Sequence, residues 1–74
     1  MVIKTQYKYL RFQKRTMDLK KKSIWDCFDS ADNKLGEVRW YPRWRCYCYF
    51  PLTAAIYSAG CLLDIRDFIE SLTR

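Results

Sequence analysis

Residues 35–51 read LGEVRWYPRWRCYCYFP, and this stretch decides the fold. It predicts two β-strands that fold back at Tyr41-Pro42-Arg43, because Pro42 presets φ for a turn and cannot donate a ladder hydrogen bond. Side chains of a strand point alternately to its two faces. The alternation predicts an apolar face toward the core, made of Val38, Trp40, Trp44, Cys46, Cys48 and Phe50. The opposite face would carry arginines and tyrosines, namely Arg39, Tyr41, Arg45, Tyr47 and Tyr49.

The N-terminal third, residues 1–22, is expected to be a basic strand or arm. Residues 2–15 alternate imperfectly between apolar and basic side chains, which is typical of an edge strand with a charged outer side. A short helix over residues 10–21 is the alternative.

The rest of the chain predicts a β-meander over residues 23–57, with a short edge strand at residues 54–57, followed by a helix over residues 58–73. Apolar residues recur at helical spacing from Cys61 to Leu72, including Leu62, and Ser58 is a suitable N-cap. A helix this short must bury its apolar stripe against the sheet. The sequence therefore predicts one α+β domain, 1–74, with an antiparallel sheet of four to five strands and one C-terminal helix packed on one face.

Charge is unevenly distributed along the chain. The formal net charge is +6, but residues 1–22 hold eight bases and one acid, and residues 23–74 hold six bases and seven acids. This segregation indicates a polyanionic or acidic partner, or a solubilising face around the first strand. Tyrosines and arginines of the hairpin could stack on bases and meet phosphates, or pair across strands without any ligand. The candidate binding residues are Lys4, Lys8, Arg11, Lys14, Arg15, Lys20, Lys21, Lys22, Arg39, Tyr41, Arg43, Arg45, Tyr47 and Tyr49.

The sequence argues against catalysis and against a metal site. It contains no histidine, and its two glycines stand alone, so common general bases and phosphate loops are missing. The four cysteines lack the paired spacing of zinc fingers and are expected to pack in the core. No cofactor is expected. With no apolar leader and no bilayer-length apolar run, a cytoplasmic chain with reduced thiols and no membrane partner is expected.

Residues 35–51, followed by CLLDIRDFI at residues 61–69, resemble a pattern of small phage and prophage proteins. That pattern runs as a Leu-Gly-x-aliphatic-x-Trp strand, a Trp-Arg-x-Tyr strand and a Cys-Leu-x-Asp-Ile helix. The resemblance attaches no activity and no site residues. It implies a context, the cytoplasm of a host cell, where small phage proteins commonly bind host or phage machinery and include inhibitors of CRISPR and other defence systems. The positive charge differs from the acidic, DNA-mimicking style of many such inhibitors.

These observations predict a small non-catalytic binding protein. The leading hypothesis is docking on nucleic acid, or on a nucleic-acid-bound host complex, through the basic and aromatic surface. The alternative is a protein-binding inhibitor of a host factor or of an anti-phage defence system, as anti-CRISPR proteins are, with its main contacts around the turn at Trp40, Tyr41, Arg43 or Trp44. A third hypothesis is self-association through the sheet face that one helix leaves open.

Overall fold

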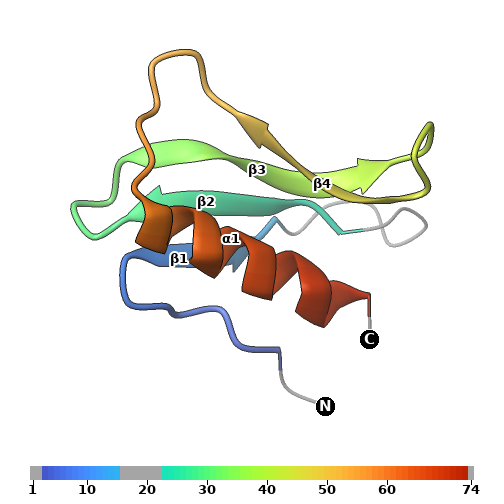
Figure 1. Cartoon of the computed structure of the whole chain (residues 1–74), viewed down its shortest axis with the longest axis horizontal. Helices are drawn as coiled ribbons and strands as arrows, with labels where there is room; N and C mark the ends of the chain where they lie inside the picture. The colour runs from blue at the N-terminus through green and yellow to red at the C-terminus, as the bar shows by residue number, and fades with distance from the viewer. Residues whose placement is uncertain (1–2, 16–22, 74) are drawn as a thin grey trace.

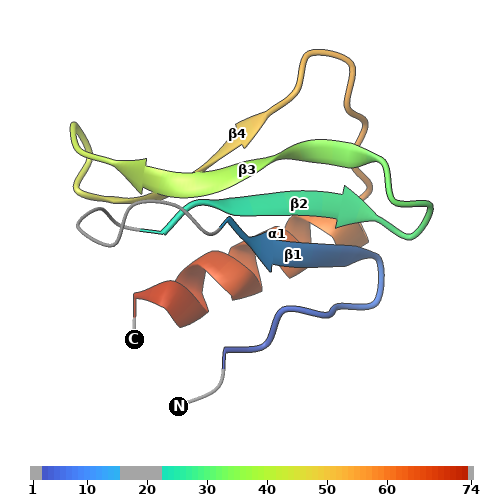
Figure 2. The ribbon, with the colours of Figure 1, turned by 180° about the vertical axis from the view of Figure 1, so that it is seen from behind.

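Four antiparallel strands in the order β1-β2-β3-β4 form one sheet, and a helix lies across one of its faces (Figure 1). The computed structural model describes residues 3–15 and 23–73. Seen from behind, the opposite face carries no other element of the described chain (Figure 2). The predicted α+β architecture is confirmed. Its elements are β1 (Leu10–Lys14), β2 (Trp25–Asp29), β3 (Lys34–Tyr41), β4 (Cys46–Pro51) and α1 (Ala59–Leu72).

The edge strand predicted over residues 2–15 is shorter in the structure. Only Leu10–Lys14 form β1, which rules out a helix over these five residues, and residues 16–21 of that alternative lie outside the described residues. Residues 3–9 fold back along the outer edge of β1, where the amide of Tyr7 donates to the carbonyl of Leu10 at 2.8 Å and the amide of Phe12 donates to the carbonyl of Thr5 at 2.9 Å. The N-terminal segment therefore occupies the β1 edge of the sheet.

The prediction of a further edge strand at residues 54–57 is wrong. A turn forms instead, in which the amide of Ala55 donates to the carbonyl of Leu52 at 3.2 Å. Strand β4 ends at Pro51 just before this turn, and the amide of Leu52 makes the last bond toward β3, to the carbonyl of Leu35 at 2.9 Å. The sheet consequently ends at β4.

The helix begins and packs largely as its sequence predicts. Ser58 is the N-cap, and its hydroxyl accepts a hydrogen bond from the amide of Cys61 at 3.2 Å. Ile65 and Phe68 are the buried residues of the apolar stripe. Leu62 does not belong to it, because its position around the helix axis lies to one side of Ile65 and Phe68, and 55% of Leu62 is exposed.

The core is an aromatic cluster between α1 and the sheet. Phe68 is fully buried, and its ring stacks on Phe12 of β1 with 4.0 Å between centroids. Trp25 of β2 meets the same ring edge-on at 5.1 Å, and Tyr7 does so at 6.4 Å. This contact joins the helix, two strands and the N-terminal segment.

The register between β3 and β4 corrects the predicted faces of the hairpin. Tyr41 pairs with Cys46, so the turn contains the four residues 42–45, and Val38 pairs with Tyr49. Odd-numbered residues of β3 therefore share a face with even-numbered residues of β4, and a shift of one residue moves every side chain of a strand to the other face. Tyr47 and Tyr49 lie on the helix side, whereas three residues predicted for the core lie on the opposite side: Cys46, Cys48 and Phe50.

Tyr49 has a structural role on the helix side. Its hydroxyl lies 2.6 Å from that of Tyr57, which donates to the carbonyl of Leu35 at 2.9 Å. Burial, followed by the hydrogen bond with Tyr57, raises the pKa of the Tyr49 phenol well above its usual value. Burial likewise raises the pKa of the nearby Cys27 thiol to about 11. Both groups are neutral parts of the core at physiological pH.

Candidate binding face

The sheet face that points away from α1 is the candidate binding face (Figure 2), and we call it the open face. Its charged half lies over β2 and the start of β3, and its aromatic half lies over β3, β4 and the turn between them. Of the predicted binding residues, it carries Arg11, Arg15, Arg39 and Tyr41.

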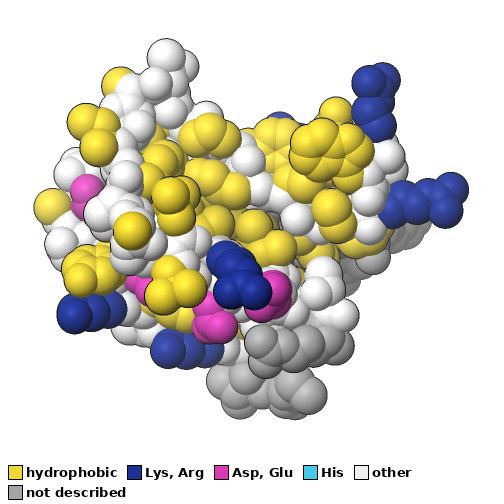
Figure 3. Space-filling view, in the orientation of Figure 1, with side chains coloured by type: hydrophobic (Ala, Val, Ile, Leu, Met, Phe, Trp, Pro, Cys, Tyr) yellow, Lys and Arg dark blue, Asp and Glu magenta, His cyan; other side chains and the backbone are white. Residues whose placement is uncertain are grey.

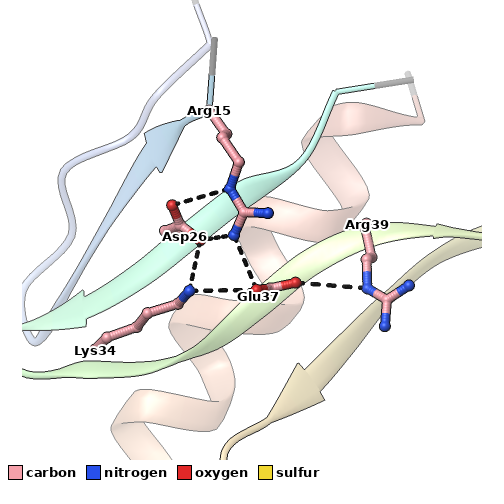
Figure 4. Close-up of polar contacts among 5 residues, drawn as sticks. All are labelled: Arg15, Asp26, Lys34, Glu37 and Arg39. Atoms are coloured by element: carbon pink, nitrogen blue, oxygen red, sulfur yellow. Dashed lines mark hydrogen bonds and ion pairs between the residues drawn. The ribbon is translucent and has the colours of Figure 1, made fainter. Parts of the chain in front are cut away.

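The charged half is a cluster of three bases and two acids (Figure 4). Asp26 of β2 and Glu37 of β3 are cross-strand partners, and two like charges directly opposite would repel. Arg15 relieves this repulsion, because its Nη2 atom lies 2.5 Å from Asp26 Oδ1 and 2.9 Å from Glu37 Oε2. Lys34 Nζ binds the same two carboxylates at 3.1 and 3.2 Å.

The cluster changes the protonation of its acids. Burial opposes ionisation of Asp26, but hydrogen bonds from Arg15 and Lys34 outweigh it, so the pKa of this carboxyl is lowered. The hydrogen bond from Arg15 also lowers the pKa of Glu37 against a smaller effect of burial. Arg39 joins the cluster at 3.5 Å from Glu37 Oε1. Arg15 and Arg39, both predicted to meet phosphates, thus already have carboxylate partners.

Acid should weaken this cluster. Because the pKa values of Asp26 and Glu37 are lowered on folding, the stability that they contribute is present above the ordinary carboxyl pKa of about 4 and is lost as the pH falls through the lower folded values. Glu37→Gln should therefore reduce the free energy of unfolding by about 1 kcal/mol at neutral pH and by much less in acid. Thermal melts of both proteins between pH 7 and about pH 2 measure this difference.

The control is Glu70→Gln on α1. Glu70 is exposed and, within the part of the chain that the structure describes, pairs with Arg66 at 3.3 Å, so its substitution should change stability little at any pH. A Glu37→Gln variant that melts like Glu70→Gln throughout would show that the cluster contributes nothing to stability.

The aromatic half surrounds Tyr41 at the end of β3. The ring of Tyr41 meets Trp44 edge-on at 5.1 Å and Phe50 at 6.0 Å. The guanidinium of Arg39 lies 3.7 Å from the centroid of Phe50. A shallow hollow of about 240 Å³ lies among these rings, and its lining residues are Tyr41, Trp44, Cys48, Tyr49 and Phe50.

The turn between β3 and β4 holds the most exposed ring of this half. Trp44 is 69% exposed and lies between Arg43 and Arg45, which are also exposed. Neither arginine has an acidic partner within ion-pair distance among the residues that the structure describes. Arg45 adopts a left-handed backbone conformation, with φ of 53°, which completes the four-residue turn. We call residues 41–45 the hairpin tip.

Arg11, although it lies on the open face, and the described lysines among the predicted binding residues do not join the hairpin tip in one surface. Arg11 pairs with Asp32 at 2.7 Å and covers the ring of Phe28. Lys14 pairs in register with Trp25, so it lies on the helix side. Lys4 and Lys8 lie over tyrosine rings of the N-terminal segment, and Lys20, Lys21 and Lys22 are outside the described residues.

Two features of the face could not be read from the spacing of aromatic and basic residues. The acids that neutralise Arg15 are 11 and 22 residues away in sequence. The exposure of Cys48 and Phe50 depends on the number of residues in the turn. The turn holds four residues, 42–45, in place of the three expected, which reverses the faces of β4, and no glycine or asparagine among them signals this length.

The cysteines form no cluster with other ligands. Within residues 3–15 and 23–73, no three side chains of the types that bind metals come together. The Sγ atoms of Cys46 and Cys48 are 3.7 Å apart on the open face, and all four cysteines are free thiols. Helix α1 has 14 residues, which is too short to span a bilayer, and the described residues contain no longer helix.

Comparison with known proteins adds no relative. No family model matches the chain, and no match is found among curated proteins or among solved structures. The geometry of the open face and the hairpin tip therefore carries the functional argument.

Proposed function

We propose that the protein binds single-stranded nucleic acid, alone or within a host nucleoprotein complex, through its hairpin tip. The observation that carries this proposal is Trp44, a ring 69% exposed between two arginines without described acidic partners. An indole ring offers a stacking surface to any base, and neighbouring guanidinium groups meet backbone phosphates. Double-stranded nucleic acid keeps its bases stacked inside, so a single strand suits this arrangement better.

The rest of the open face limits where the strand runs. Arg15, Lys34 and Arg39 are engaged by Asp26 and Glu37, so they have little net charge left for phosphates. The hollow beside Trp44 offers further aromatic surface for an adjacent base. This proposal replaces the broad basic footprint predicted from sequence with a small contact, for which moderate affinity is expected.

The test is titration with a short single-stranded oligonucleotide, followed by tryptophan fluorescence and by anisotropy of a labelled strand. Stacking on Trp44 should quench its emission, and Trp44→Ala should weaken binding about tenfold or more, since a base–aromatic stack is worth about 1–3 kcal/mol. Arg43→Gln should lower the slope of log affinity against log salt by about 0.7.

The matched control for Arg43→Gln is Arg66→Gln. Both variants lose one positive charge, but Arg66 lies on α1 and pairs with Glu70. If both variants bind equally, the net charge and not the hairpin tip determines affinity. No binding at low salt, to DNA or RNA strands, would contradict the proposal outright.

A protein partner is the second candidate, and the hollow beside Tyr41 favours it. Tyrosine, tryptophan and arginine are enriched in hot spots of protein interfaces, and such residues cluster around fully desolvated pockets. An inhibitor of a host or anti-phage defence factor, acting in the cytoplasm of a host cell, would use the same residues. Affinity purification with and without nuclease separates the candidates, because only a protein partner is retained after nuclease and lost with Trp44→Ala.

A further inference from the structure

The two edges of the sheet differ in how they are covered. Thr5 and Tyr7 of the N-terminal segment bond to the outer side of β1, at Phe12 and Leu10, and Gln6 forms an isolated bridge with Arg11. No strand of the described chain pairs with the outer side of β4. Figures 1 and 2 both show residues 52–58 leaving β4 beyond its C-terminal end. The outer side of β4 is therefore a bare strand edge.

The alternation of backbone groups identifies what this edge presents. The amide of Leu52 donates to the carbonyl of Leu35 at 2.9 Å, so even-numbered residues next to it bond toward β3. The amides and carbonyls of Tyr47 and Tyr49 then point outward. Pro51 also faces outward, where its lack of an amide proton does no harm. A neighbouring strand would find its hydrogen-bonding groups at Tyr47 and Tyr49.

We propose that a second copy of this chain pairs with this edge, β4 against β4 in antiparallel orientation. A two-fold axis through Cys48 places Tyr47 of each copy opposite Tyr49 of the other, in hydrogen-bonded pairs. Cys48 then lies directly opposite Cys48 of the second copy, in a non-hydrogen-bonded pair. The two sheets join into one, with both helices on one side and both open faces on the other.

The sequence of β4 favours a second copy as the occupant. The strand CYCYFP has no charge, whereas natural edge strands are usually protected by charges such as lysine. Antiparallel pairing of β4 with its own copy is isologous, so each Tyr47 meets the Tyr49 of the other copy, and the contact closes after two copies. The antiparallel arrangement also separates like charges, because Arg43 and Arg45 of each copy approach the uncharged residues 52–56 of the other.

The surface beside the outer edge of β4 exposes hydrophobic side chains that a second copy could cover. Figure 3 shows hydrophobic side chains gathered in a hollow between the 52–58 segment and the β3–β4 turn. Ile56, in that segment, is 88% exposed, and Leu52 is 46% exposed. Pairing through only two outward residues per copy forms few hydrogen bonds, so a reversible dimer that depends on concentration is expected.

Two measurements test the dimer and its register. Analytical ultracentrifugation over a wide concentration range should show exchange between monomer and dimer. Diamide, which takes two electrons and two protons from a pair of thiols, should join the copies through Cys48 in Cys46→Ser/Cys61→Ser. Opposite residues of a non-hydrogen-bonded pair have Cα atoms about 4.5 Å apart, within the range that a disulfide spans.

The matched control is Cys48→Ser/Cys61→Ser, which keeps Cys46. In the proposed register Cys46 lies opposite Phe50, and the two Cys46 residues are on the order of 13 Å apart along the strands, too far for a disulfide. Equal cross-linking through Cys46 would overturn the register. In addition, Cys48→Lys should weaken the dimer at least tenfold relative to Cys48→Ser, since it sets two ammonium groups opposite each other.

A monomer at every concentration, or a dimer that Cys48→Lys leaves unchanged, would overturn the proposal. Circular dichroism of each variant shows whether it is folded, and cross-linking of the serine variants needs no charged substitution in the sheet. The outcome does not depend on whether the hairpin tip binds nucleic acid, because no oligonucleotide is present.

Discussion

Replacing Phe68 with alanine should lower the free energy of unfolding by about 3–5 kcal/mol. Phe68 is fully buried, and its ring touches residues of the N-terminal segment, of β1 and of β2. Removing it leaves a cavity where all these elements meet α1. A domain of 74 residues has roughly 4–11 kcal/mol of stability, so much of it would be lost.

Urea denaturation followed by circular dichroism measures this effect as a lower midpoint with an unchanged slope. Leu63→Ala on the same helix is the control. Leu63 is 60% exposed, so its truncation should change stability by no more than about 0.5 kcal/mol. Similar losses in the two variants would contradict the packing of α1 through Phe68.

Gly36→Ala should also destabilise the fold, by about 1–3 kcal/mol or more. A Cβ atom at Gly36 would lie 2.7 Å from the backbone oxygen of Phe50 and 2.6 Å from the hydroxyl of Tyr49. The backbone of β4 is held by its ladder with β3, so it cannot move away without loss of hydrogen bonds. Displacing Tyr49 would also break its contact with Tyr57. Thermal denaturation of the variant measures the combined cost.

The control is the same substitution at the other glycine. A Cβ atom at Gly60 would lie 2.5 Å from a ring atom of Tyr9, but Tyr9 is a half-exposed side chain that can rotate away. Alanine also favours a helix over glycine by about 1 kcal/mol, which offsets the contact. If Gly60→Ala were the more damaging of the two, the close approach of β3 to β4 would not be what limits Gly36.

The helix and the four observed strands could be predicted because local patterns determine them, whereas the fifth strand expected at residues 54–57 does not form. The apolar spacing from Cys61 to Leu72 matches one helical face, and Ser58 precedes it as a cap. In each case the information lies within a few neighbouring residues.

The faces of β4 could not be predicted because they depend on one turn. Arg45 takes a positive φ, which glycine or asparagine would usually signal, and nothing in RWR marks it as the residue that completes the turn. The turn is one residue longer than expected. Tyr47 and Tyr49 therefore lie on the helix side of the sheet, and Cys48 and Phe50 lie on the open face.

The binding surface was overestimated from charge for a related reason. A count of bases treats each as available, but Arg15 meets Asp26 and Glu37 only because β1, β2 and β3 align in a particular register. The sequence shows Trp44 between two arginines, but the alternation wrongly assigned its ring to the core face, and 69% of Trp44 is exposed. The sequence could not show whether those two arginines have acidic neighbours in space.

The fold-back of residues 3–9 limits how far copies of this chain can assemble. Fibre growth by strand addition requires two available borders on each molecule, one to receive a neighbour and one to offer to the next. Here the N-terminal segment already occupies the border at β1. Association along the remaining border would stop at a closed pair, so an uncharged, tyrosine-rich strand can remain uncovered without starting an endless polymer.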